Sequence, residues 1–368
     1  MSSAAVSPPR ISGFSYVRPL GSGGFAQVYQ YEQDMPRRVV AVKVLSESLS
    51  APSSRAMFEA EADAMAQLSS HPSIVSIFAA SVSADGHPYI AMEYCPQSLR
   101  ERSKGQTSPL NEVLDAGVRL AGALETAHQA GVLHRDIKPS NVLIATTGRP
   151  MLADFGIVSL RGQMLGEGTS QAMSIPWAAP EVVAGDTSGT VASEIWSLGA
   201  TLYTFAAGRS PFASPQRGQN TESKMMDRIK RARYVPVPGA QGYEHFDAVI
   251  ARALMQKPEQ RFTSMREFGE ALRQAQRAYG WDATPLDVVG AGWAPLAAAA
   301  QEPRGPVITT VQEQGRAQRR EEAARQRIEE ELLPDRKTSP VKAGLIGAGI
   351  AVGILAAAGV AFALMGGL

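Results

Sequence analysis

A glycine-rich stretch near the N-terminus could bind phosphate groups: Gly21-Ser22-Gly23-Gly24-Phe25-Ala26-Gln27-Val28. Glycine lets the backbone pass close to a phosphate and point its N–H groups at the oxygens. No helix pattern follows the stretch, so it fails the context of a dinucleotide-binding fingerprint, and it lacks the Gly-Lys-Ser/Thr ending of a mononucleotide P-loop. Alone the pattern is weak, because glycine-rich hairpins are common and most of them bind nothing.

A lysine inside an apolar strand pattern is the second candidate: Lys43, in Val40-Ala41-Val42-Lys43-Val44. Burying a lysine is costly unless the charge is paired. Glu61, in the helix pattern that follows, is the candidate partner, whereas Glu59 lies on a different face of that helix. The alternative is that Lys43 lies on the outer face of the strand.

Three polar motifs follow in the second part of the chain: His134-Arg135-Asp136-Ile137-Lys138-Pro139-Ser140-Asn141, Asp154-Phe155-Gly156 and Ala179-Pro180-Glu181. Any one of them could be a chance loop, but all three in order, downstream of the glycine-rich stretch and Lys43, could not. The set resembles that of the eukaryotic-type (Hanks-type) protein kinases, of the kind found in bacteria as membrane-tethered Ser/Thr kinases. The resemblance extends from residue 12 to about residue 278.

The resemblance implies an ATP site with Mg²⁺ as cofactor and Mn²⁺ as an alternative ion. Lys43, held by Glu61, would bind the α- and β-phosphates, and Asp154 and Asn141 would bind the metal ions. Met92-Glu93-Tyr94-Cys95 resembles the hinge that holds adenine, with Met92 as the gatekeeper. The ATP-binding residues implied in this way are Gly21, Ser22, Gly23, Gly24, Phe25, Ala26, Val28, Lys43, Met92, Glu93 and Cys95.

The resemblance also assigns the residues that would carry out the transfer to a protein hydroxyl group. Asp136 would accept or orient the hydroxyl proton, and Lys138, which is typical of Ser/Thr kinases, would meet the γ-phosphate. Ser174 stands near the substrate pocket, where we expect it to contact Asp136 and Lys138. Glu181 and Arg261 match a buried ion pair of the family, which is structural.

The loop between Gly156 and Ala179 contains candidate phosphorylation sites. Arg135, beside the catalytic aspartate, is the type of residue that pairs with a phosphate on such a loop. We predict Thr169 as the first site and Ser170 as the second. The chain would then be a non-specific Ser/Thr protein kinase that phosphorylates its own loop.

Two residues depart from the family pattern. Ala26 stands where a third glycine is commonest, which should matter little. Glu194 replaces the aspartate that usually anchors the catalytic loop from below. One extra methylene in a packed site costs on the order of 1–3 kcal/mol, so activity could be reduced.

The sequence leaves two other functions as alternatives. A pseudokinase would act as a nucleotide-binding scaffold at the membrane; Glu194 supports this reading, and the intact Lys43, Asp136 and Asp154 oppose it. A small-molecule kinase of the antibiotic-phosphorylating type is opposed by Lys138, the Ala-Pro-Glu motif and the long phosphorylatable loop.

The elements that must position these residues follow from the hydrophobic patterns. The pattern predicts a helix over Ser53–Leu68, and a helical period dominates after Pro109. The expected fold is therefore α+β and bilobal, with a small β-rich lobe before a larger helical lobe and a ligand cleft between them. The β-type runs of the small lobe are Tyr16–Leu20, Val28–Tyr31, Val39–Leu45 and Tyr89–Glu93.

Composition limits the remaining classes. Lys and Arg total 36 against 35 Asp and Glu, a net charge of +1, so we expect no nucleic-acid partner. Hydrophobic residues make up 44% of the chain, which suits a globular core. The single cysteine, Cys95, excludes an intrachain disulfide and a cysteine-based zinc site.

The two ends of the chain differ from its middle. We expect a flexible leader over residues 1–11, a kinase domain over 12–278, and a juxtamembrane linker with a charged helix over 279–342. Residues 343–368 carry no charge and are long enough to span a bilayer as a single helix. A buried helix or hairpin of a soluble fold is the alternative for this last segment.

The residues around the apolar segment predict its orientation in the membrane. Arg336, Lys337 and Lys342 precede the segment, which by the positive-inside rule places the kinase domain in the cytoplasm and the C-terminus outside or at the outer face. We expect no further domain outside. Gly349 and Gly353 have the spacing of a helix-dimer motif, so a homodimer is a hypothesis, although such spacing arises easily by chance. Protein substrates, the activating signal and the pathway cannot be identified from the sequence.

Overall fold

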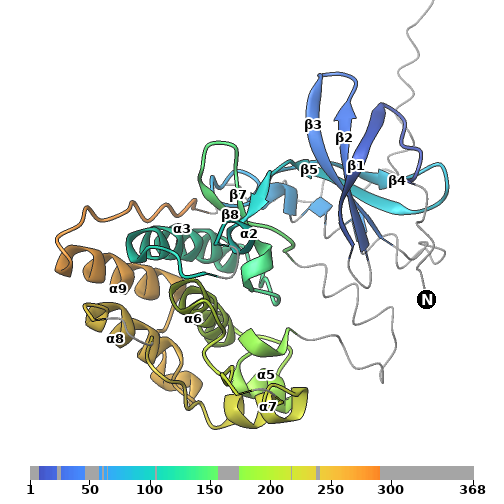
Figure 1. Ribbon diagram of the computed structural model, residues 1–368. Coiled ribbons are helices and arrows are strands. Elements are labelled where there is room, and N and C mark those ends of the chain that lie inside the picture. The colour runs from blue at the N-terminus through green and yellow to red at the C-terminus, as the bar shows by residue number, and fades with distance from the viewer. Residues whose placement is uncertain are drawn as a thin grey trace, which may run out of the picture. The chain divides into compact units, whose positions relative to one another are not determined.

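The computed structural model describes residues 8–22, 26–45, 58–59, 62–63, 65–103, 106–155, 174–216, 218–237 and 241–290. These residues form a strand-rich small lobe followed by a helical large lobe (Figure 1). The two-lobed α+β architecture predicted from the sequence is thus confirmed. Several predictions lie outside the described residues: those for Gly23, Gly24, Phe25, Glu61, Thr169, Ser170 and the apolar segment 343–368.

The small lobe is built on a five-stranded antiparallel sheet in the order β1-β2-β3-β5-β4. Strand β3 lies at its centre and is buried from Val40 to Leu45, as expected for a nearly continuous apolar run. Lys43 is paired in register with Val28 on one side and Ile90 on the other. The strands are β1 (Phe14–Ser22), β2 (Ala26–Gln33), β3 (Arg38–Leu45), β4 (Ile77–Val82) and β5 (Pro88–Glu93).

Residues 8–11 pack against the outer face of this sheet. The Tyr31 hydroxyl donates to the carbonyl oxygen of Pro9 at 2.6 Å, and Ile11 is buried beside Tyr31 and Val40. The leader predicted for residues 1–11 therefore overlaps the folded lobe at its C-terminal end, because Ile11 supplies an apolar side chain to the sheet. Helical residues at 58–59, 62–63 and 65–68 fall within the predicted helix Ser53–Leu68.

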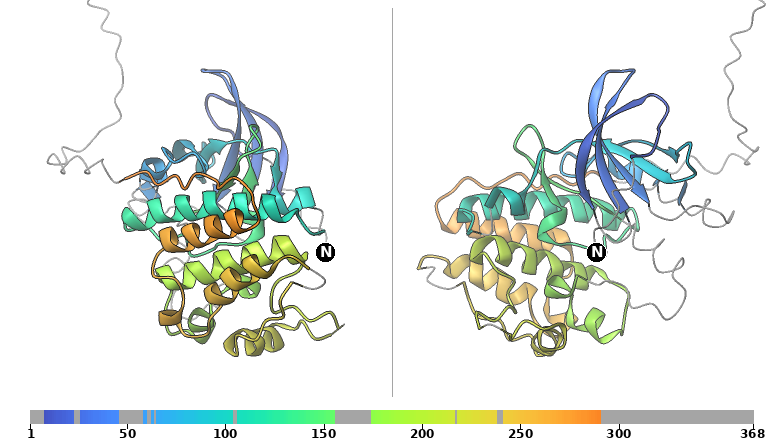
Figure 2. Two further views of the ribbon diagram at one scale, coloured as in Figure 1. Left: turned by 90° about the vertical axis from the view of Figure 1, so that its left-hand side faces the viewer. Right: turned by 45° about the vertical axis from the view of Figure 1, so that its right-hand side comes forward.

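The large lobe is centred on two long helices, α3 (Leu110–Gln129) and α6 (Val191–Ala207). Helix α3 is buried along most of its length and lies beside α9 (Met265–Ala278), as both views in Figure 2 show. A small sheet, β6 (Gln97–Ser98), β7 (Val142–Ile144) and β8 (Pro150–Leu152), lies at the boundary with the small lobe. The remaining helices are α2 (Leu99–Ser103), α5 (Pro180–Ala184), α7 (Glu222–Lys230) and α8 (Glu244–Ala253), with 3₁₀ turns at Pro139–Asn141, Ile175–Trp177 and Pro258–Gln260.

Residues 281–290 follow α9 without regular secondary structure and run back along α3, as the orange trace in Figure 1 shows. The sequence placed them in a linker because the stretch from Trp281 to about Val311 is rich in Pro, Gly and Ala. In the structure, this first part of the predicted linker is packed on the large lobe. Within the described part of the chain, no helix is both long enough and apolar enough to cross a membrane.

Candidate active site

The two lobes meet directly through Lys43 and Asp154. The Lys43 side chain is only 4% exposed, and its ammonium nitrogen lies 2.7 Å from Asp154 Oδ1. A buried lysine needs such a partner, so the outer-face alternative for Lys43 is excluded. Asp154 has a φ of 67°, a left-handed backbone conformation that is unusual for a residue with a side chain and is frequent at functional sites. Glu61, the partner predicted for Lys43, is outside the described residues.

A triangle of hydrogen bonds surrounds the Asp136 carboxylate. Lys138 Nζ donates to Asp136 Oδ2 at 2.7 Å, and Ser174 Oγ donates to Asp136 Oδ1 at 2.7 Å. Lys138 Nζ also donates to Ser174 Oγ at 3.0 Å, which closes the triangle. The contact expected between Ser174 and this pair is thus present. It joins the catalytic-loop motif to the C-terminal part of the loop between Gly156 and Ala179.

Asn141 is oriented by the same aspartate. Its Nδ2 donates to the carbonyl oxygen of Asp136 at 2.8 Å and to Oδ2 at 3.3 Å, so Oδ1 is the side-chain atom that a cation could use. The Ala153 N–H donates to the carbonyl oxygen of Asn141 at 2.9 Å, which brings Asn141 next to Asp154.

These two oxygen donors fit a magnesium ion that travels with a nucleotide. Mg²⁺ in such sites takes one or two protein oxygens and completes its shell with phosphate and water oxygens. Among the described residues, no group of three or more His, Cys, Asp or Glu side chains could hold a metal. The arrangement of Asn141 and Asp154 therefore suits an ion held jointly with phosphates.

His134 links the catalytic loop to the strand that precedes Asp154. Its Nδ1 accepts from the Asp136 N–H at 3.2 Å, and its Nε2 donates to the carbonyl oxygen of Ala153 at 2.9 Å. The ring is fully buried and lies 4.6 Å from the Phe155 ring, between centroids. Burial lowers the pKa of His134, so the neutral form is the one that the fold contains.

Acidification is expected to destabilise the fold through this histidine. Because the pKa of His134 is lower in the folded chain than its ordinary value of 6.5, its contribution to stability is complete above about pH 6.5 and is lost as the pH falls below it. The thermal midpoint, measured at fixed ionic strength, should therefore fall between pH 7 and pH 5. His134→Gln should weaken this dependence. A midpoint independent of pH in this range would contradict the prediction.

Glu194 holds the backbone of Arg135 through a hydrogen bond. Arg135 has a φ of 65°, and its N–H donates to Glu194 Oε1 at 2.6 Å. The other carboxylate oxygen, Oε2, lies 2.6 Å from His128 Nε2 at the end of α3. Glu194 is 2% exposed, so both oxygens are buried and bonded. The longer side chain thus makes the backbone contact that the family's aspartate is expected to make, and His128 is a partner that the sequence did not reveal.

The predicted hinge and an apolar cluster lie beside the Lys43–Asp154 pair. Met92 is buried, and the N–H of Glu93 donates to Ser76 at 2.9 Å. Burial raises the pKa of the half-buried Cys95 thiol to about 12, so it stays protonated and unreactive at neutral pH. Three partly buried apolar side chains of the two lobes adjoin this cluster: Leu20, Val28 and Leu143. No motif in the sequence marked Leu20 or Leu143 as a site residue.

Two further sets of predicted residues lie within the described part of the chain. Gly21 and Ser22 end β1 opposite Val28 and Gln27 of β2, so the two flanks of the glycine-rich stretch pair with each other. Arg261 forms a bidentate ion pair with Glu181, with distances of 2.6 and 2.8 Å, and its side chain is fully buried. The predicted ion pair between these two residues is therefore present.

Comparisons with known proteins agree with this geometry. Residues 14–274 match the family model described as protein kinase domain. Serine/threonine-protein kinase PknK of Mycobacterium tuberculosis is 38% identical over 284 residues, which cover 75% of this chain and 25% of PknK. PknB of Mycobacterium leprae is 32% identical over 274 residues, covering 71% of this chain and 42% of PknB. The chain thus spans a quarter to under half of these relatives.

A solved structure is similar as well. The crystal structure of a mutant kinase domain of Mycobacterium tuberculosis PknI aligns with a TM-score of 0.54 and 28% identity, and it covers 75% of this chain and 99% of that domain. The family model covers more than half of the chain, and the described site brings together Lys43, Asp136, Lys138, Asn141 and Asp154. The chain therefore belongs to the protein kinase family, among the Hanks-type Ser/Thr kinases of bacteria.

Proposed function

We propose that this protein transfers the γ-phosphoryl group of ATP to Ser or Thr hydroxyls of proteins, including those of its own activation loop between residues 156 and 179. The observation that carries the proposal is the ion pair between Lys43 of the small lobe and Asp154 of the large lobe. Phosphoryl transfer needs positioning and charge neutralisation more than covalent chemistry, and these are the two side chains that would supply both.

The nucleotide would lie between the lobes. Leu20 and Val28 on one side and Leu143 on the other would enclose the flat adenine, and the hinge backbone at Glu93 and Cys95 would bind its polar edge. The glycine-rich stretch and Lys43 would hold the phosphates. Asp154 and Asn141 would hold Mg²⁺, which neutralises the charge that develops on the phosphate oxygens when it is bound.

Asp136 would position the attacking hydroxyl group. The substrate oxygen forms a bond to the γ-phosphorus, the bond between that phosphorus and the bridging oxygen of ADP breaks, and the hydroxyl proton passes to a carboxylate oxygen of Asp136. Lys138, held 2.7 Å from Asp136, would pair with the transferred phosphoryl group. Ser174 would orient both side chains from the substrate side.

Phosphorylation of the activation loop is the proposed means of activation. Arg135 is exposed, so its guanidinium group could pair with a phosphate on that loop. The full chain incubated with Mg-ATP should carry phosphate on Thr169 or Ser170 by mass spectrometry, and the Asp136→Asn chain should carry none. The double variant Thr169→Ala/Ser170→Ala should lose about tenfold or more of its activity towards a peptide. Undiminished activity of that double variant would remove these sites from the proposal.

The pseudokinase alternative depended on Glu194. Since Glu194 accepts the hydrogen bond from Arg135 at 2.6 Å, the catalytic loop keeps its anchor, and no other described residue favours a scaffold without activity. Absence of phosphate on any residue of the full chain, with Mg-ATP still bound, would restore that alternative.

Residues 343–368 are proposed as a membrane anchor that holds the kinase domain at the cytoplasmic face. Support comes from the uncharged length of the segment and from the preceding Arg336, Lys337 and Lys342. The full chain should remain in the membrane fraction after carbonate washing, and Leu355→Arg together with Val360→Arg should release it. Recovery of the unaltered chain in the soluble fraction would oppose the anchor.

A further inference from the structure

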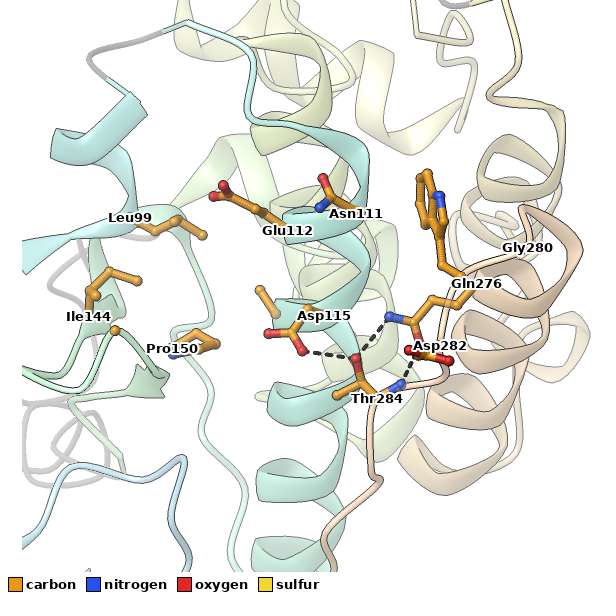
Figure 3. Close-up of a pocket in the computed structure, with 13 residues that line it drawn as sticks. Leu99, Asn111, Glu112, Asp115, Ile144, Pro150, Gln276, Gly280, Asp282 and Thr284 are labelled. Atoms are coloured by element: carbon orange, nitrogen blue, oxygen red, sulfur yellow. Dashed lines mark hydrogen bonds between the residues drawn. The ribbon is translucent and has the colours of Figure 1, made fainter.

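Residues 281–290, called the strap below, are fastened to the large lobe at Thr284. The Thr284 N–H donates to Gln276 Oε1 at 2.9 Å, and its hydroxyl donates to Asp115 Oδ1 at 2.8 Å. Gln276 Nε2 donates back to the Thr284 hydroxyl at 2.9 Å, and Figure 3 shows these three side chains turned toward one another. Gln276 and Thr284 are both buried, so this end of the strap is part of the packed lobe.

Two glycines inside helices leave room for the strap. A methyl group on Gly122 of α3 would collide with the carbonyl oxygen of Asp287, and one on Gly269 of α9 would lie 2.8 Å from Leu286 Cδ1. Glycine in a helix interior is less favourable than alanine by about 1 kcal/mol. The close approach of the strap explains why these two helix positions are occupied by glycine.

Asp287 joins the strap to the boundary between the lobes. Its carbonyl oxygen accepts from His71 Nε2 at 3.0 Å, and its carboxylate accepts from Arg149 at 2.5 Å. His71 is buried, and its Nδ1 accepts from the Ser73 N–H, so Nε2 carries the proton. Arg149 also donates to the Ser73 hydroxyl at 3.0 Å. One strap residue therefore holds both the loop 69–76 and the β7–β8 turn.

The loop 69–76 is bonded to two parts of the active site. The Val75 N–H donates to the carbonyl oxygen of Leu152 at 3.0 Å, and the Leu152 N–H donates to that of Ser73 at 2.9 Å. Leu152 stands two residues before Asp154. On the other side, the Glu93 N–H of the hinge donates to Ser76 at 2.9 Å. A displacement of this loop would thus be transmitted to the proposed metal ligand and to the hinge.

We propose that Asp287 is a positioning residue for nucleotide binding, and that the strap holds the loop 69–76 in the place that aligns Asp154 and the hinge. Asp287 acts through His71, Ser73 and Leu152 and touches no reacting atom. The inference rests on the proposed kinase function and adds a structural input to its ATP site from the segment that follows α9.

Gly122→Ala in the full chain tests the strap. The added methyl group pushes Asp287 away from α3, while alanine favours the helix itself. Gly117→Ala is the matched control: it lies in the same helix, but its methyl group would meet the side chains of Leu202 and Leu272 at 2.8 and 2.9 Å and nothing of the strap. The readouts are the dissociation constant of Mg-ATP by calorimetry and amide hydrogen exchange of residues 69–76.

Gly122→Ala is expected to weaken Mg-ATP binding by about 5- to 20-fold and to speed exchange in the loop, with neither change in Gly117→Ala. Asp287→Ala should weaken binding less, because the backbone bond to His71 remains, and should add little to Gly122→Ala. Equal binding and exchange in Gly122→Ala and Gly117→Ala would overturn the proposal. Neither readout needs turnover, so an inactive wild-type chain would count against the proposed function and leave the strap result interpretable.

Discussion

Asp136→Asn is expected to lower kcat for peptide phosphorylation by about 10²- to 10⁴-fold, the usual size of a lost acid–base group. The carboxylate accepts from Ser174 and from Lys138, each at 2.7 Å, and is the group proposed to take the hydroxyl proton. An amide cannot take that proton, and its NH₂ group would face the Lys138 ammonium or the Ser174 hydroxyl. Steady-state kinetics with a Ser/Thr peptide would measure the loss.

The affinity for Mg-ATP separates this effect from unfolding. Lys43, Asp154 and the hinge do not depend on the Asp136 charge, so the dissociation constant of Mg-ATP should change by less than about threefold. Asp227→Asn, on the exposed surface of α7, serves as the matched control and should leave kcat unchanged. A loss in kcat below about tenfold for Asp136→Asn would mean that another group takes the proton.

The sequence predicted the elements with strong patterns and missed those held by pairing alone. The β-type runs fall within β1, β2, β3 and β5, and those in β3 and β5 are buried and nearly all apolar. Strand β4 was missed, since it is an edge strand with a register shift between Ile77 and Ala79 and exposed residues at its centre. Strands β6 to β8 have two or three residues each, too few for a period to appear.

Site residues that belong to a sequence motif could be predicted. Residues that reach the site only through packing could not. Lys43, Asp136, Lys138, Asn141 and Asp154 are brought together as the motifs suggested. His128 carried no such signal, because a histidine in the last turn of a helix is compatible with a solvated end. The strap left a weak signal in the sequence at Gly122 and Gly269, because glycine inside a helix goes against helix propensity.

Glu194→Ala is expected to reduce the free energy of unfolding by about 2–4 kcal/mol, the sum of a lost charge-assisted hydrogen bond and a small cavity. The Arg135 N–H would be left without its acceptor, while Arg135 keeps a left-handed backbone conformation that this bond supports. His128 would lose the carboxylate at 2.6 Å. Chemical unfolding monitored by fluorescence should show the loss, together with a fall in kcat, because Asp136 follows Arg135 directly.

Two further variants decide whether the length of Glu194 matters. Glu194→Gln keeps an acceptor for the Arg135 N–H at the same reach, so stability should fall by less than about half as much as in Glu194→Ala. Glu194→Asp restores the residue usual in the family but draws the carboxylate back by one methylene, away from either Arg135 or His128. Since both carboxylate oxygens are bonded at 2.6 Å, the structure has adapted to glutamate, and Glu194→Asp should lower stability and kcat. Higher activity in Glu194→Asp would instead mean that the longer side chain restrains this kinase.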